Sequence, residues 1–463
     1  MSGEKGTDVR AGLLALMLLA GQQTSPFPSS FHGGVPSGTA TSEAIALSVA
    51  DVINRALEHN LGVLTSEQAG EQARGARWVA LSQLLPNISG RLSETREKIN
   101  LAVFGFPLPA GVPPVVGPLN VFDARLFVTQ SVVDLTALND ARAAAHDVAA
   151  ARYSYKSARD LVVLVAANMY LQALASSARL ESARAQVETA QALYTQAIDL
   201  KQSGLIAGID VLRAQVQLNT EQQRATATRN DFEKAKLQLA RVIGLPIGQA
   251  FTLSDQIPYA PVPEITIEQA LERAYKGRPD YQAALERVQA AEASRASARA
   301  TALPSVRVTA DFGDVGLTPN DARGTFNITG ALTVPIFEGG RTRGRVLEAD
   351  AELRRRRAEA DDLKAGIYYD VRTAFLDLQA TGQQLDVATK TRDLAAAQLT
   401  QARDRFAAGI ASNIEVVQAQ EAVTLANEQY ITGLYSYNVA KATLARSFGA
   451  AEEAVRRYLG GVR

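Results

Sequence analysis

The sequence has 463 residues, enough for two or three ordinary domains, and carries 48 basic and 48 acidic side chains. This balance gives no overall positive charge to attract nucleic acid or anionic lipid. The chain contains no cysteine, which excludes disulfides, thiolate metal sites, cysteine nucleophiles and thioether-linked lipid anchors. Aromatic residues make up only 6% and alanine dominates the apolar fraction, a composition that favours long, closely packed helices.

The N-terminal residues 1–20 are predicted to be a secretory signal peptide. Lys5 and Arg10 precede the apolar run AGLLALMLLA (residues 11–20), and a polar, proline-rich segment follows. This order is typical of export signals, and the run is too short to span a bilayer. A short buried helix is the alternative. The site of cleavage is poorly defined, and no later apolar stretch reaches membrane-spanning length.

The rest of the chain reads as one unit written twice. Residues 47–60, LSVADVINRALEHN, align with residues 265–278, ITIEQALERAYKGR, and a Leu-Pro pair at 85–86 recurs at 303–304. We therefore predict a first repeat at 43–243, a proline-rich connector at 244–264, a second repeat at 265–450 and a C-terminal tail at 451–463. The first repeat carries about 14 extra residues in its loop at 100–119, as expected of an exposed loop tip.

Each repeat is predicted to contain a helix, two strands, a very long helix, a break and a returning helix. The first helices are expected at 43–83 and 265–300, the long ones at 139–202 and 340–408, and the returning ones at 210–243 and 414–449. A helix over 139–202 would be roughly 95 Å long, which suits a coiled coil rather than a globular domain. Large residues and alanine alternate at heptad spacing in both long helices: Leu180, Ala183, Val187, Ala190, Tyr194 and Ala197 in the first, and Leu385, Ala388, Arg392, Ala395, Leu399 and Ala402 in the second.

Four short segments alternate between polar and apolar residues and are predicted strands. They lie at about 87–99, 119–133, 304–313 and 324–337, and Phe127 interrupts the polar face of the second segment. Such alternation fits either a half-buried sheet or a membrane barrel. Four strands are too few to close a barrel, and an open sheet would leave unpaired backbone groups in lipid. If the strands cross a membrane, several chains must therefore complete one barrel.

Nothing in the sequence indicates an enzyme. The three histidines, His32, His59 and His146, are far apart and have no metal-ligand spacing. The basic run at 354–357 is flanked by acidic residues and is interpreted as a solvated helix face. No cofactor, metal or nucleic-acid site is expected.

The combination of features resembles the TolC-like outer-membrane efflux protein family. The resemblance rests on the duplicated order of elements, the Leu-Pro before a strand in both copies, the segment TVPIFEGGR at 333–341, and the two breaks of the form GxxxxxDV and GxxxxxEV. It implies a mostly α fold with a small β part, in which a homotrimer closes a 12-stranded outer-membrane barrel above a helical tunnel through the periplasm. It also implies a periplasmic adaptor and an inner-membrane transporter as partners.

The two breaks then become tips of helical hairpins, at 203–210 and 408–415. Gly204 and Gly409 are suited to end a helix in the left-handed conformation, and Asp210 lies where a carboxylate meets the positive end of the next helix. The resemblance implies adaptor contacts at these tips, through Gly204, Asp210, Gly409 and Asn413.

The second tip is the predicted gate. By resemblance, Glu415 matches the first position of an acidic ring that constricts the pore, while Gln418 occupies the second position without a charge. A helix-capping role for Glu415 remains the alternative. Phe406 and Ala411 occupy positions where the family often has polar latch residues, so we expect an entrance that is weakly latched or latched elsewhere.

Exit of small molecules or secreted polypeptides through the outer membrane is therefore the expected function. Two alternatives stay open from the residues: a periplasmic adaptor or scaffold with helical hairpins, and a soluble structural coiled coil in which the strands form a local sheet. The sequence does not identify the substrate.

Overall fold

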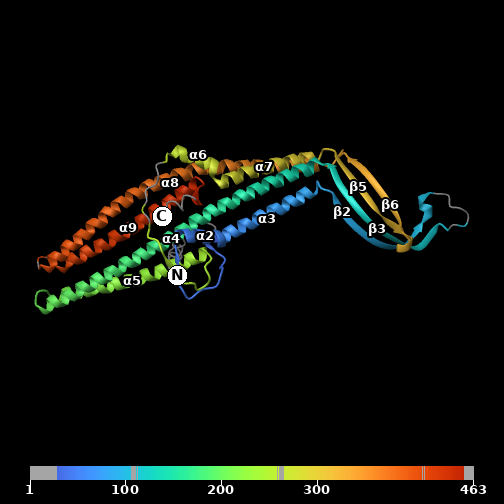
Figure 1. Ribbon diagram of the computed structural model, residues 1–463. Coiled ribbons are helices and arrows are strands. Elements are labelled where there is room, and N and C mark those ends of the chain that lie inside the picture. Colours follow the sequence, from blue (N-terminus) through green and yellow to red (C-terminus); the bar gives the residue numbers. More distant parts are fainter. Residues whose placement is uncertain are drawn as a thin grey trace, which may run out of the picture.

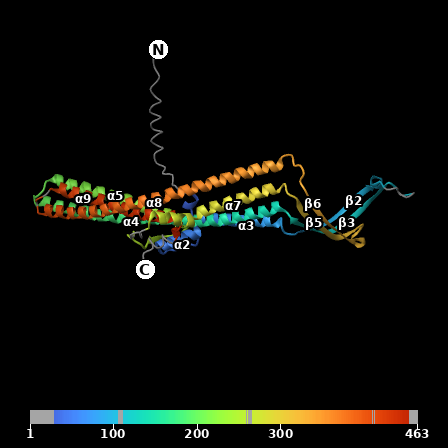
Figure 2. The same ribbon diagram turned by 90° about the horizontal axis from the view of Figure 1, so that it is seen from above.

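The computed structural model describes residues 29–105, 111, 113–257, 259, 265–408, 410 and 412–452. The molecule is elongated, with a β-sheet at one end and two helical hairpins at the other, and the short helices α2 and α6 lie near its middle (Figures 1 and 2). The predicted signal peptide and all of the predicted tail except Ala451 and Glu452 lie outside the described residues.

The two repeats have matching orders of elements. After η1 (Ser29–His32), the first repeat contains β1 (Ile45–Leu47), α2 (Val49–His59), α3 (Leu61–Ser82), β2 (Asn87–Asn100), η2 (Leu101–Phe104), β3 (Val115–Val133), α4 (Leu135–Gln202) and α5 (Gly208–Val242). The connector contains β4 (Phe251–Leu253), and the second repeat contains α6 (Ile267–Gly277), α7 (Pro279–Ala300), β5 (Ser305–Gly316), η3 (Pro319–Asp321), β6 (Arg323–Thr333), α8 (Arg341–Ala407) and α9 (Asn413–Ser447). A mostly helical fold with a small β part is confirmed.

The first helix of each repeat is broken in two. The prediction of single helices at 43–83 and 265–300 was therefore wrong. Asn60 separates α2 from α3 in an extended conformation, and its side-chain oxygen accepts a hydrogen bond from Gly62 N at 2.8 Å. Arg278 separates α6 from α7, also extended, because the following Pro279 disfavours a helical residue before it. Residues 45–47, expected to be helical, instead pair in parallel with 251–253 of the connector.

The main apolar core lies near the middle of the molecule, where α2, β4 and the C-terminal part of α5 pack around α4. Tyr170 on α4 is buried and donates from its hydroxyl to Asp255 Oδ2 at 2.9 Å, which ties the connector to the core. In the described part of the chain, α4 is the helix apolar enough to cross a bilayer, with a mean hydropathy of 1.6 over its best window. Because 67% of that window is buried inside the molecule, α4 is a core helix.

The heptad stripes form the packed faces of the long helices. Five of the predicted positions on α8 are buried, namely Leu385, Ala388, Ala395, Leu399 and Ala402. The sixth, Arg392, places its guanidinium 4.2 Å from the ring centre of Tyr430 on α9. On α4, Leu180, Ala183, Ala190 and Ala197 are buried. Alanine at alternate positions lets neighbouring helices approach closely.

The sheet has the antiparallel order β2-β3-β5-β6, so its edges are one strand from each repeat. One face carries apolar side chains in register across the strands, including Leu126 beside Phe312 and Phe312 beside Phe326. These side chains are exposed, Phe326 by 74%. β6 ends at Thr333 rather than at 337 as predicted, because Pro335 cannot donate a ladder hydrogen bond.

The opposite face of the sheet is polar and ion-paired. Arg125 on β3 contacts Asp311 on β5, and its Nε lies 3.2 Å from Asp123 Oδ1. The exceptional Phe127 lies under the guanidinium of Arg91, which is 5.1 Å from the ring centre. The sheet therefore separates an apolar, exposed face from a charged one.

Candidate functional site at the hairpin tips

The two hairpin tips, at 203–210 and 408–415, have the same turn geometry. In the first, Ser203 N donates to Asp199 O at 3.0 Å and Leu205 N donates to Leu200 O at 2.9 Å. In the second, the corresponding bonds are Ala408 N to Asp404 O at 3.0 Å and Ile410 N to Arg405 O at 2.9 Å. Both patterns satisfy carbonyl groups at the end of a helix.

Glycine permits the first turn. Gly204 has a φ of +73°, the left-handed conformation predicted for it, and this conformation favours glycine because it has no Cβ. The matching Gly409, and Ala411 at one of the two expected latch positions, lie outside the described residues.

The acidic residues of the two tips have different partners. Asp210 lies in the first turn of α5 and pairs with Arg213 on the same helix, at 3.2 Å between Oδ1 and Nη1. Glu415 lies in the first turn of α9 and pairs across the hairpin with Arg405 of α8, at 3.1 Å between Oε1 and Nε. The Glu415 side chain is 44% exposed, so its carboxylate is neutralised by a neighbour but still reached by water.

Asn413 links the two hairpins. Its side chain is only 2% exposed, and its Nδ2 donates to the backbone oxygen of Asp210 at 3.0 Å. This is a direct contact between the tip of α4–α5 and the tip of α8–α9. The first hairpin has Gly208 at the equivalent place and cannot return the bond.

Phe406 is a core residue of the second tip. It is 4% exposed and packs in an apolar cluster with Val416 and Ala419 of α9. An aromatic ring is well suited to fill the end of a hairpin in which alanine dominates. The Phe406 ring has no hydroxyl and cannot form a polar latch at this position.

Gln418 and Glu415 have different surroundings. Gln418 lines a groove of about 380 Å³ between α5 and α9, together with the apolar side chains of Ile209, Leu212, Val216, Ile414 and Val417. Glu415 instead faces α8. Within a protomer, the two predicted gate residues therefore contact different neighbouring helices.

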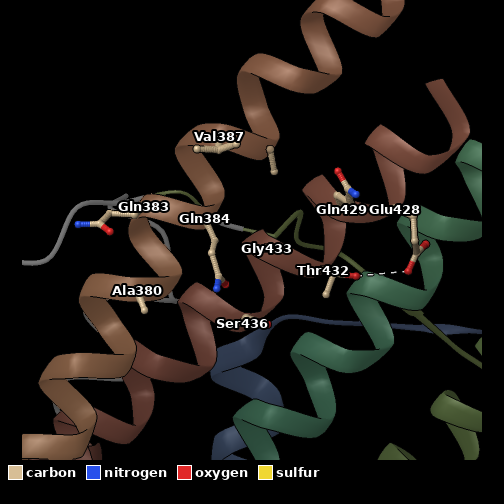
Figure 3. A pocket seen from close by; sticks show the side chains of 10 residues that line it. Ala380, Gln383, Gln384, Val387, Glu428, Gln429, Thr432, Gly433 and Ser436 are labelled. Carbon is tan, nitrogen blue, oxygen red and sulfur yellow. Dashed lines mark hydrogen bonds between the residues drawn. The ribbon is translucent and has the colours of Figure 1, made fainter. Parts of the chain in front are cut away.

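Two of the larger hollows elsewhere along the helices border α9. Figure 3 shows the first, about 590 Å³ between α8 and α9, in which Gln384 reaches toward α9 near Gly433. Glu428 lies at its edge, accepts a hydrogen bond from Thr432, and pairs with Arg179 of α4 at 2.8 Å. The second hollow, also about 590 Å³, lies among α4, α5 and α9 and contains the buried Glu221.

Sequence reasoning missed Arg405 and Glu221. Arg405 was detectable in principle, because it lies in the last turn of the helix that leads into the tip containing Glu415. Glu221 carries no sequence signal, since an acidic residue on a long polar helix is ordinarily solvated. In the described residues, no three His, Cys, Asp or Glu side chains are placed to hold a metal ion.

An exposed apolar sheet joined to long helical hairpins is the architecture of a chain that can insert its sheet into a membrane and extend its helices away from it. The sequence profile of the family described as outer membrane efflux protein matches residues 52–245 and 270–450. The chain belongs to this family, whose members are outer-membrane channels and transport proteins rather than enzymes. The adaptor and soluble coiled-coil alternatives are thereby rejected.

Curated relatives cover most of the chain. It is 24% identical to the pyoverdine export outer membrane protein OpmQ of Pseudomonas putida, over 87% of this chain and 85% of the relative. It is 21% identical to the alkaline protease secretion protein AprF of Pseudomonas aeruginosa, over 89% and 86%. Among solved structures, the Campylobacter jejuni CmeC outer membrane channel has a TM-score of 0.74 at 18% identity, covering 93% of this chain and 94% of that one.

Proposed function

We propose that three copies of this chain form an outer-membrane exit duct that opens into the periplasm at the hairpin tips. The observation that carries the proposal is the four-stranded sheet with an exposed apolar face and two free edges, β2 and β6. In lipid those edges need hydrogen-bond partners. Because β2 and β6 run in opposite directions, β6 of one copy can pair antiparallel with β2 of the next. Three copies then close a barrel of 12 strands with its apolar face toward lipid.

The hairpins form the periplasmic entrance in this proposal. Long helices carry the tips far from the sheet, so a duct fixed in the outer membrane extends toward the inner one (Figure 1). The groove between α5 and α9 presents exposed Leu212 and Val216, and such an apolar surface suits the helical tip of a periplasmic adaptor. An inner-membrane transporter would supply the energy through that adaptor.

The entrance is proposed to be held by the contact from Asn413 to Asp210, with Glu415 as its acidic residue. Three copies of Glu415 around one axis would favour cations over anions at the constriction. Arg405 moderates this charge within each copy. This arrangement is latched at a place other than Phe406 and Ala411.

The cargo is proposed to be a small molecule or a secreted polypeptide. The relatives divide between these classes, since the name of OpmQ specifies pyoverdine export and that of AprF specifies alkaline protease secretion. No feature of the described residues selects one class.

The test is reconstitution of the purified mature chain into planar bilayers. We expect heat-modifiable trimers in the outer-membrane fraction and discrete conductance steps of low resting amplitude. Recovery of the chain in the soluble periplasmic fraction, without conductance, would contradict the proposal. Deletion in the native host, followed by a screen of toxic compounds and of the secreted proteins, would then identify the cargo.

A further inference from the structure

The cavity among α4, α5 and α9 contains an acidic residue that is almost completely removed from water. Glu221 on α5 is 1% exposed. Its Oε1 accepts a hydrogen bond from Gln217 Nε2 at 3.0 Å, and Arg224 Nη1 lies 3.4 Å from its Oε2. Oε2 itself has no hydrogen-bond partner. A buried carboxylate with one unsatisfied oxygen is unfavourable when ionised.

A second unsatisfied acceptor lines the same cavity. Gln186 on α4 is 6% exposed, and its Oε1 also lacks a hydrogen-bond partner. Two buried oxygens without a protein donor line one hollow of about 590 Å³, and protonation of Glu221 Oε2 removes the cost of a buried charge there. The cavity therefore stabilises the neutral form of Glu221.

The charged groups around Glu221 come from all three helices. Glu421 on α9 faces it across the cavity, and Arg224 is its neighbour on α5. Arg179 of α4 and Glu428 of α9 also line the cavity, but they pair with each other at 2.8 Å. Burial raises the pKa of Glu221, and Glu421 raises it further, while Arg224 lowers it.

We infer that Glu221 and Glu421 form a proton-sensitive joint between the two hairpins, which holds them together when Glu221 is protonated. Ionisation places two negative charges on opposite sides of the seam between α5 and α9, and like charges in a partly buried site repel. The hairpins are the two sides of the proposed entrance, so the inference rests on the proposed function. It adds a regulator that none of the predicted tip residues supplies.

The direction of the pH effect follows from the raised pKa of Glu221. Glu221 binds its proton more tightly in the closed arrangement than in an open, hydrated one. The closed arrangement is therefore favoured at low pH and loses its advantage as the pH rises through the raised pKa. A duct with this joint would be more tightly closed in an acidified periplasm.

The experiment measures the distance between the hairpins directly. The chain has no cysteine, so Leu212→Cys on α5 and Ile414→Cys on α9, both exposed, can be spin-labelled in the full-length mature trimer in lipid nanodiscs. We expect the distance distribution to move to longer values as the pH is raised from acidic to neutral and above. Glu221→Gln should remain at the short distance throughout, because its amide cannot ionise.

Two further variants make the test specific. Glu421→Gln should move the transition to lower pH, because it removes the facing negative charge; Glu421 is exposed, so this variant is expected to fold normally. Glu188→Gln, an exposed carboxylate two residues beyond Gln186, should behave as the parent does. An unchanged transition in Glu221→Gln, or a distance independent of pH in the parent, would overturn the inference. Conductance recorded on the same sample tests the proposed function separately, since a channel without a pH response contradicts this inference alone.

Discussion

The two hairpins arise from one repeated sequence, yet they are stabilised differently. Their turns have the same backbone hydrogen bonds at equivalent positions of the two repeats. At the tip, however, the second hairpin has the buried Phe406 where the first has the exposed Lys201, and the second has Asn413 where the first has Gly208. Farther along, the first has the buried Glu221 where the second has Ala426. Backbone geometry was retained while the side chains diverged.

This difference indicates a division of roles. The second tip has its own apolar cluster and supplies the amide that bonds to the first. The first hairpin carries the buried carboxylate of the seam. Changes at equivalent positions of the two hairpins should therefore have unequal effects.

The largest effect is expected for Phe406→Ala. Removing a buried phenylalanine side chain costs about 3–5 kcal/mol, here confined to the second tip. Hydrogen–deuterium exchange should show amides at the ends of α8 and α9 exchanging at least about a hundredfold faster. Lys201→Ala, the matched change in the first hairpin, should leave exchange near its parent rate. Equal effects at the two positions would refute the division of roles.

Asn413→Ala should have the next largest effect. It removes the bond from one tip to the backbone oxygen of Asp210 in the other, at a cost of about 0.5–1.5 kcal/mol. We expect higher resting conductance and frequent open events in planar bilayers. Asn413→Asp cannot donate the bond and should resemble the alanine variant, whereas conductance at the parent level in both variants would argue against a link here.

Asp160 on α4 provides a pH-dependent difference between the repeats, because the second has Ala365 at the equivalent place. Burial raises the pKa of Asp160 from 3.8 to about 6, with Glu452 and Asp280 acting in the same direction and Arg446 opposing them. Since the folded pKa lies above the unfolded one, stability should fall as the pH rises from about 4 to about 6 and stay lower above it. Trimer melting followed by gel mobility should show this decline, and Asp160→Asn should flatten it.

The smallest effect on stability is expected for Arg405→Ala. Its ion pair with Glu415 is about half exposed, so its loss costs about 0–1 kcal/mol. The released carboxylate should nevertheless increase cation selectivity, measured as the reversal potential in a salt gradient and weakened by added salt. Arg213→Ala breaks the corresponding pair in the first hairpin and serves as control. A larger change in selectivity from Arg213→Ala would assign the acidic ring to Asp210.

Much of the architecture could be predicted because it repeats. The alternation in the strands and the spacing of alanine along α4 and α8 are local patterns, and each was present twice. The break at Arg278 was also detectable, since Pro279 follows it, but the equivalent break at Asn60 has no proline. There the side-chain amide of Asn60 bonds to Phe31 O and Val242 O, which are distant in sequence. Such contacts exist only once the chain has folded.

The candidate site was predictable only in outline. Glycine and acidic residues located the two turns, because their backbone requirements are local. The pairing of Glu415 with Arg405, the bond from Asn413 to Asp210 and the burial of Glu221 depend on how four helices pack. Sequence patterns indicate which face of a helix is packed. They do not indicate which residue of the neighbouring helix that face contacts.

The most direct test of the central claim is a reversible link across the two tips. Cysteines introduced at Ile209 on α5 and Ile414 on α9, which line one groove, can be joined by a short thiol-cleavable bifunctional reagent. We predict that the linked trimer conducts at the low resting level and that reduction restores opening in the same bilayer. Each single-cysteine variant, treated identically, should conduct as the parent does. Full opening of the linked trimer would contradict the claim that the two hairpins form the gate.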